Sequence, residues 1–404
     1  RQNLRYADLR TDYRSIYGDG LNVADNSINR GYAHSQEELN QFAVDTQAQA
    51  NFTTGAVEHT VLLGVDYQRS RNDINGIFGA ATPLDAVNPQ YGNDTPTTLY
   101  APYLYLNKQQ QTGLYAQDQI ELDRWVLTLG GRYDYLMNSA FNRTDNDDKK
   151  DHHQDFTWRG GLNYVFDNGI APYISYSESF IPNSGTTFGG ETFDPSRAKQ
   201  YEAGVKYIPK DRPVVITGAI YQLTKTNNLT GDPTAPLFSV QGGEIRSRGA
   251  ELEAKAALNA NINITAGYSY TDAEYTEDNF LRGKTPVQVP KHTASLWGDY
   301  TFNETAFSGL TLGAGVRYIG ESKSLYRHLP ANGDKQDQNF DVAGYTLVDA
   351  AIKYDLTRFG LPGSSIGINV NNLLDREYVA SCYREHACYW GAERQIVGTA
   401  TFRF

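Results

Sequence analysis

The chain has 404 residues, of which 40% are hydrophobic and 12% aromatic, with 29 Tyr, 37 Gly and a formal net charge of -11. No apolar run approaches the roughly 18–20 residues of a membrane-spanning helix, which excludes a helical membrane protein. The acidic balance argues against nucleic acid as a partner, and the many aromatic residues argue against disorder. The composition therefore indicates a large, Tyr-rich, all-β protein.

Apolar and polar residues alternate with period two along almost the whole chain, the pattern of half-exposed β-strands. In 125–135, 262–271 and 310–318, aliphatic residues occupy the middle of the apolar face and tyrosines, such as Tyr133 and Tyr318, its end. A bilayer accounts for this order, because amphipathic rings prefer the headgroup level and form girdles around a lipid-facing band. The pattern predicts a transmembrane antiparallel β-barrel.

About sixteen strands are expected from this alternation, joined by connections that are short and long in turn. The expected strands are 1–19, 39–54, 58–76, 109–123, 124–138, 154–167, 170–182, 198–209, 213–228, 239–258, 262–278, 288–303, 308–326, 342–357, 365–381 and 391–404. The expected long loops are 20–38, 77–108, 139–153, 183–197, 229–238, 279–287, 327–341 and 382–390. Short turns on one side and long loops on the other are typical of outer-membrane barrels whose long loops face outward.

The two ends of the chain and its cysteines concern origin. The chain starts at Arg1 without a signal segment, which indicates a mature or truncated piece. The last strand ends on Phe404, like the assembly signal of bacterial outer-membrane proteins. Cys382 and Cys388, with no second pair to complete a zinc site, favour one disulfide from an oxidising compartment, with two free thiols as the alternative.

Several segments carry a family resemblance, among them 173–180 (YISYSESF), 199–207 (KQYEAGVKY) and 370–378 (VNNLLDREY). They resemble the TonB-dependent ferric-siderophore receptors of the Gram-negative outer membrane. The stretch around Cys382 and Cys388, with 391–394 (GAER), resembles the ferrichrome-type branch. The resemblance covers essentially the whole chain.

The resemblance also implies what surrounds this chain. Such receptors have an N-terminal plug, a segment that contacts TonB, and a barrel of about twenty-two strands. Residues 1–404 would be the C-terminal part of that barrel, without the plug and about six first strands. Strands 1–19 and 391–404 would then be left as unpaired edges of an open sheet.

Candidate ligand-binding residues are aromatics at the outer ends of strands and in the last loop, namely Tyr17, Phe78, Tyr383 and Tyr389. A siderophore holds its iron fully coordinated, so its receptor needs aromatic faces and hydrogen-bond donors, and neither iron ligands nor a cofactor. By resemblance, the first three fall where ferrichrome-type receptors use barrel aromatics, whereas Asp19 stands where an aromatic is expected. The alternative is ordinary rim or girdle aromatics.

Four basic residues are expected just above the girdle, at the alternate strand positions that face the lipid: Arg10, Arg69, Arg71 and Lys108. Cations at this level would meet lipopolysaccharide phosphates, and the resemblance implies a lipopolysaccharide contact here as well. A solvated rim of snorkelling side chains is the alternative. On the other parity, charged residues are expected to line a wet lumen and to pair locally: Arg132, Asp134, Arg317, Asp349 and Lys353.

Other chemistry is less well supported by the sequence. The acidic stretch 145–151 lacks the Gly and terminal Glu of an EF-hand, so a solvated loop tip is favoured over a calcium site. The seven histidines include His34, His328 and His386 in expected loops, where a haem receptor would use one, but no haem-type motif accompanies them. No nucleophile motif such as G-x-S-x-G is present, so an enzyme is not expected.

The leading hypothesis is uptake of ferric hydroxamate siderophores across the outer membrane, energised through TonB by the inner-membrane proton gradient. A passive porin is the alternative. The resemblance further implies lipopolysaccharide, phages and bacteriocins as partners.

Overall fold

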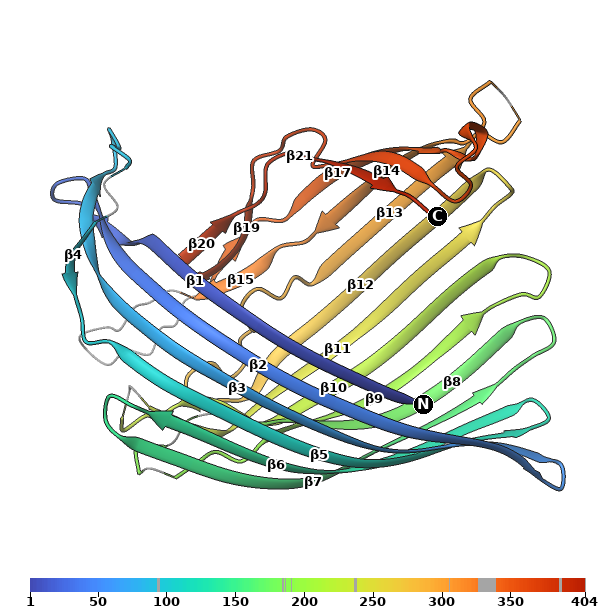
Figure 1. Ribbon diagram of the computed structural model, residues 1–404, viewed down its shortest axis with the longest axis horizontal. Helices are drawn as coiled ribbons and strands as arrows, with labels where there is room; N and C mark the ends of the chain where they lie inside the picture. The colour runs from blue at the N-terminus through green and yellow to red at the C-terminus, as the bar shows by residue number, and fades with distance from the viewer. Residues whose placement is uncertain are drawn as a thin grey trace.

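The computed structural model describes residues 1–403 except 93–94, 184, 186, 190, 236–237, 305, 326–338 and 385–386. Its main element is a 17-stranded sheet, antiparallel in every pairing, and a second sheet has four strands (Figure 1). Within the described ranges, no helix is long and apolar enough to cross a membrane. Most of the expected loop 327–341, including His328, lies outside the described residues, and so does His386.

The strands of the large sheet follow one another in chain order, each paired with the next, and β4 only extends the pairing of β3. They are β1 (Gln2–Asn22), β2 (Ser27–Thr54), β3 (Val57–Asp85), β4 (Pro96–Leu99), β5 (Tyr103–Leu122), β6 (Trp125–Asn142), β7 (Asp147–Tyr164), β8 (Ile170–Ile181), β9 (Ser196–Tyr207), β10 (Val214–Gly231), β11 (Ser239–Ala257), β12 (Ile262–Glu277), β13 (His292–Thr301), β14 (Leu310–Ile319), β17 (Tyr345–Asp355), β18 (Ser365–Asn371) and β21 (Gln395–Thr401). Leaving out the four-residue β4, these seventeen strands give the sixteen that the alternation predicts.

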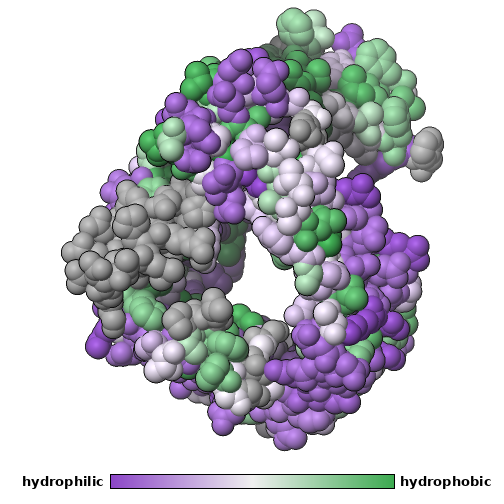
Figure 2. Space-filling view, turned by 90° about the vertical axis from the view of Figure 1, so that its left-hand side faces the viewer, coloured by the Kyte–Doolittle hydropathy of each residue, from purple (hydrophilic) through white to green (hydrophobic). Residues whose placement is uncertain are grey.

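The small sheet joins the last outer loop to the connection that follows β14. It contains β15 (Ser322–Leu325), β16 (Asn339–Val342), β19 (Val379–Arg384) and β20 (Ala387–Trp390). In Figure 1 it lies toward the end of the molecule where β4 lies, and the short turns gather at the opposite end. We call these the loop end and the turn end. Figure 2 looks at the loop end and shows an opening through the molecule.

The sheet is open. β1 pairs with β2 alone and β21 with β18 alone, and within the described residues no ladder joins β1 to β21. The expectation of two unpaired edges is therefore confirmed. These edges expose backbone N–H and C=O groups that a membrane-spanning sheet must pair.

Two of the expected outer loops are wrong, because strands continue through them. β1 and β2 run on to a four-residue turn at 23–26 that contains Asn26 at φ 53°, and β6 and β7 to a turn at 143–146 with Asn146 at the same φ. Above a membrane both faces of a hairpin are wet, so the hydrophobic alternation fades while the hydrogen-bond ladder persists. Residues 147–151, expected at a loop tip, accordingly belong to β7.

Other strand ends also differ from expectation. β3 and β5 extend into the expected loop 77–108, and β10 reaches Gly231. Several expected strands are shorter: β13 begins only at His292, β14 ends at Ile319, β18 ends at Asn371, and β21 covers only Gln395–Thr401 of the expected 391–404. In these places the chain leaves the large sheet for loops or for the small sheet.

The register separates two chemically different faces. Cross-strand partners share a face, and Leu114 (56% exposed), opposite Tyr133, lies on a face that carries exposed aliphatic residues. Near the turn end this face carries aromatic pairs, including Trp125 with Tyr164 at 4.7 Å between ring centroids. A leucine-rich band between aromatic rows is the lipid-facing surface of a barrel. We call it the outer face and the opposite one the lumen face.

Candidate functional site

Tyr17 and Phe78 lie on the lumen face near the loop end of the sheet. Tyr17 is opposite Gly31 in the β1–β2 ladder, and Phe78 is opposite Ala33 in the β2–β3 ladder. Only these small residues of β2 separate the two rings, and both rings are nearly half exposed. The arrangement leaves two aromatic faces open to a ligand inside the barrel.

Glycines let these rings lie flat against the wall. A Cβ built on Gly31 would lie 2.4 Å from the Tyr17 ring, and one on Gly76 would lie 2.0 Å from the Tyr103 ring. Tyr103 also stacks on Phe78, with ring centroids 5.1 Å apart and planes 25° apart. Tyr17, Phe78 and Tyr103 therefore form an aromatic wall on β1, β3 and β5.

Tyr103 was not among the residues proposed from sequence. The reason is that 77–108 was expected to be a loop, whereas Tyr103 starts β5 and lies opposite Gly76. The signal that points to it is the alternation Tyr103, Leu104, Tyr105, Leu106, which continues the strand outward.

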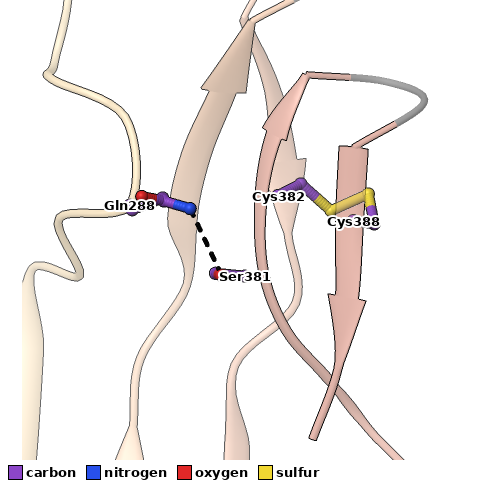
Figure 3. The surroundings of a disulfide bond; sticks show 4 residues. All are labelled: Gln288, Ser381, Cys382 and Cys388. Atoms are coloured by element: carbon purple, nitrogen blue, oxygen red, sulfur yellow. Dashed lines mark hydrogen bonds between the residues drawn. A yellow bond between two sulfur atoms is a disulfide. The ribbon is translucent and has the colours of Figure 1, made fainter. Parts of the chain in front are cut away.

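Tyr383 and Tyr389 belong to a second group, the β19–β20 hairpin of the small sheet. The predicted disulfide is present: Cys382 is bonded to Cys388 and lies opposite it in register (Figure 3). The side-chain amide of Gln288 donates to Ser381 Oγ over 3.2 Å, which ties the hairpin to the connection before β13 (Figure 3). Both tyrosines are exposed, so the clamped hairpin presents two further rings.

The basic residues above the girdle lie on the outer face of β1, β3 and β5. Arg71 is directly opposite Lys108, and Arg69 is opposite Phe42. Arg10 faces Glu38 at 3.7 Å, and Arg71 lies 3.6 Å from Asp73. Among the residues that the structure describes, Arg69 and Lys108 have no carboxylate within 4 Å. Two cations of this patch are thus available to an anion.

Charged side chains on the lumen face pair locally. Arg132 Nη1 lies 2.5 Å from Asp66 Oδ2, and its Nε and Nη2 donate to Asp134 over 2.7 and 2.6 Å. Asp134 is 1% exposed. Arg317 makes the same kind of two-point contact with Asp349, over 2.5 and 2.9 Å. The Arg132–Asp66 pair links β6 to β3 across β5, and the Arg317–Asp349 pair links the neighbouring strands β14 and β17.

In the described part of the chain, no group of three or more His, Cys, Asp or Glu side chains is placed to hold a metal ion. In the acidic stretch, Asp148 pairs with Lys150 at 2.9 Å and Asp151 with His153 at 2.7 Å.

The chain is similar to known proteins over most of its length. Residues 1–373 match the family model described as TonB dependent receptor-like, beta-barrel. The ferrichrome outer membrane transporter/phage receptor of Escherichia coli K12 is 52% identical, and the alignment covers 100% of this chain and 56% of that protein. The ferrioxamine B receptor of Salmonella typhimurium is 40% identical with the same coverage. The chain spans about half the length of these relatives.

Solved structures have the same fold at low sequence identity. The siderophore receptor PiuA from Acinetobacter baumannii has a TM-score of 0.79 at 22% identity, covering 99% of this chain and 61% of that one. The FpvAI–pyocin S2 complex has a TM-score of 0.78 at 21% identity, covering 98% and 53%. Both likenesses extend over nearly the whole chain.

Proposed function

The chain belongs to the TonB-dependent receptor β-barrel family, and from that premise we propose that it is the C-terminal barrel part of an outer-membrane receptor for ferric hydroxamate siderophores. The relatives named as a ferrichrome transporter and a ferrioxamine B receptor are similar over the whole of this chain. Those relatives are transporters and receptors, which supports transport over catalysis.

The observation that carries this proposal is the aromatic wall of Tyr17, Phe78 and Tyr103. A hydroxamate chelate presents its iron already coordinated, so the receptor recognises an outer surface of methylenes and amides. Flat rings seated on Gly31 and Gly76 offer apolar faces without projecting far into the lumen. Such a wall suits a compact chelate in the barrel mouth.

The barrel would contribute the wall, the outer half of the site and the membrane anchor. A plug and a TonB-contacting segment supplied by the rest of the protein would complete the pocket and couple it to energy. Binding would shift the plug's contact segment, and pulling on that segment would open a path through the lumen. No bond to iron forms or breaks in this scheme.

Partners on the outside follow from the same surfaces. Arg69 and Lys108, with Arg10 and Arg71 beside them, suit lipopolysaccharide phosphates, because a guanidinium binds phosphate through two parallel hydrogen bonds. One relative is named a phage receptor, and one structural neighbour was solved with pyocin S2. These names support phages and bacteriocins as users of the outer loops.

Tyr383→Ala should weaken siderophore binding in the full-length protein by about two- to tenfold, since one stacked ring is worth roughly 0.5–1.5 kcal/mol beyond its area. Equilibrium binding of ferrichrome to purified receptor measures it. Tyr318→Ala, a tyrosine on the outer face of β14, is the matched control and should leave affinity unchanged. Equal affinities for both variants would show that Tyr383 is an ordinary rim aromatic without a role in binding.

Measurements of iron uptake distinguish an energised transporter from a passive porin. Cells that lack other siderophore receptors and carry the full-length protein should accumulate ⁵⁵Fe from ferrichrome, and collapse of the proton gradient should abolish this. Liposomes containing the protein should not swell in sugar solutions. Energy-independent flux with liposome swelling would favour the porin and overturn the proposal.

A further inference from the structure

A hollow of about 1020 Å³ lies against the outer face between β6 and β12. Three small residues form its floor: Gly160 is opposite Leu129, and Ala203 and Ala250 are both opposite Ile220. Larger side chains stand around this floor, so the surface is recessed at the level of the aliphatic band.

Aromatic rings line the side of the hollow that is nearer the loop end. Trp158 and Tyr176 have ring centroids 4.6 Å apart, and Tyr176 and Tyr201 have centroids 4.9 Å apart. Toward the turn end the lining is aliphatic, with Ile174 and Ile220 strongly exposed. The lining therefore changes from aliphatic to amphipathic in the direction in which a bilayer changes from chains to headgroups.

One cation stands at the edge of the hollow nearer the loop end. Arg248 lies two residues from Ala250 on the same face, between Gln222 and Asp272 in register. Its Nε donates to the Gln222 side-chain oxygen over 2.8 Å. Within the described residues no carboxylate lies within 4 Å of the Arg248 guanidinium, so its cross-strand neighbour Asp272 forms no direct ion pair with it.

We propose that this hollow holds acyl chains of a lipopolysaccharide molecule whose phosphate binds Arg248. The hydrophobic effect does not favour a lipid in the hollow over a lipid in the surrounding bilayer, because lipid tails are as apolar as the walls of the hollow. A lipid stays there through close packing on the small-residue floor and through the charge-assisted contact of phosphate with guanidinium. The cation lies on the loop-end side, and lipopolysaccharide occupies the leaflet there.

This site is separate from the patch of Arg69 and Lys108, which lies on β3 and β5, whereas the hollow spans β6 to β12. The inference rests on the barrel's place in the outer membrane and not on the siderophore it carries. Siderophore uptake and lipid retention are therefore independent measurements.

The test counts lipopolysaccharide molecules on the full-length receptor by native mass spectrometry after extraction in mild detergent. A background variant, Arg69→Gln with Lys108→Gln, removes cations from the other patch. In this background, Arg248→Gln should lower the retained lipopolysaccharide about tenfold or more, as loss of a hydrogen bond to a charged group implies. Ala203→Leu with Ala250→Leu, which fills the floor, should lower it as well.

Ala314→Leu, an equally small-to-large change on the outer face of β14, is the matched control and should leave retention unchanged. Heat-modifiable migration on gels shows that each variant is folded, and ⁵⁵Fe uptake from ferrichrome should be the same in all of them. Unchanged retention in both hollow variants, equal loss in the control, or phospholipid in place of lipopolysaccharide would overturn the proposal.

Discussion

Expressed by itself, this chain is expected not to form a sealed barrel. The open edges belong to β1 and β21, and β1 alone is 21 residues long. About nine to eleven residues of a strand lie in the hydrocarbon, and each unpaired N–H or C=O there costs several kcal/mol. Two open edges therefore cost on the order of tens of kcal/mol, more than a folded barrel can offset.

The measurement is refolding into detergent and vesicles, followed by gel mobility with and without heating and by hydrogen exchange. The full-length protein is the control. It should stay folded on the gel unless the sample is heated, and its β1 and β21 amides should be protected from hydrogen exchange. In the isolated chain the amides on the open edge of β1 should exchange fast, while those paired with β2 exchange more slowly. A heat-modifiable species with both edges protected would contradict this expectation.

Arg132→Met should destabilise the folded barrel by about 3–5 kcal/mol, the cost of removing one partner from a buried ion pair. Arg132 bridges Asp66 on β3 and Asp134 on its own strand, and Asp134 is almost fully buried. Without the guanidinium, two carboxylates remain close together, and the amide of Gln111, which donates to Asp134 over 2.8 Å, cannot neutralise them.

Equilibrium unfolding of the full-length protein in vesicles measures this change. Arg212→Met removes an exposed arginine that lies 3.5 Å from Asp211, and it should cost less than about 1 kcal/mol. Adding Asp134→Asn to Arg132→Met should restore part of the loss, because the uncompensated charge is then gone. Similar stabilities for Arg132→Met and Arg212→Met would show that the lumen pair is not a structural tie.

The sequence reveals the fold wherever a membrane enforces two unlike faces. The alternation through Leu127, Leu129 and Tyr133 is sufficient to place β6 and to orient it. Farther out, at 20–38, both faces meet water, and only hydrogen bonding distinguishes strand from loop, so the hairpin was missed. The parallel pairing of Leu325 with Arg384 joins segments that are distant in the chain and irregular in sequence. A local sequence pattern therefore does not predict this pairing.

The candidate site shows the same division. Counting along a strand predicts the face and height of Tyr17 and Phe78, and the structure has both on the lumen face near the loop end. Tyr103 was missed with the strand that carries it. The hollow on the outer face depends on Gly160, Ala203 and Ala250 lying at one height in separate strands, and that alignment is a property of register, which short-range pattern does not determine.

The most direct measurement is the affinity of the full-length receptor for ferrichrome with the aromatic wall removed. Tyr17→Ala, Phe78→Ala and Tyr103→Ala combined should weaken binding at least about tenfold, since each ring contributes roughly 0.5–1.5 kcal/mol beyond its area. Tyr133→Ala, an outer-face ring, should leave it unchanged. No binding of any ferric hydroxamate by the unaltered protein, or equal affinity without the three rings, would contradict the account.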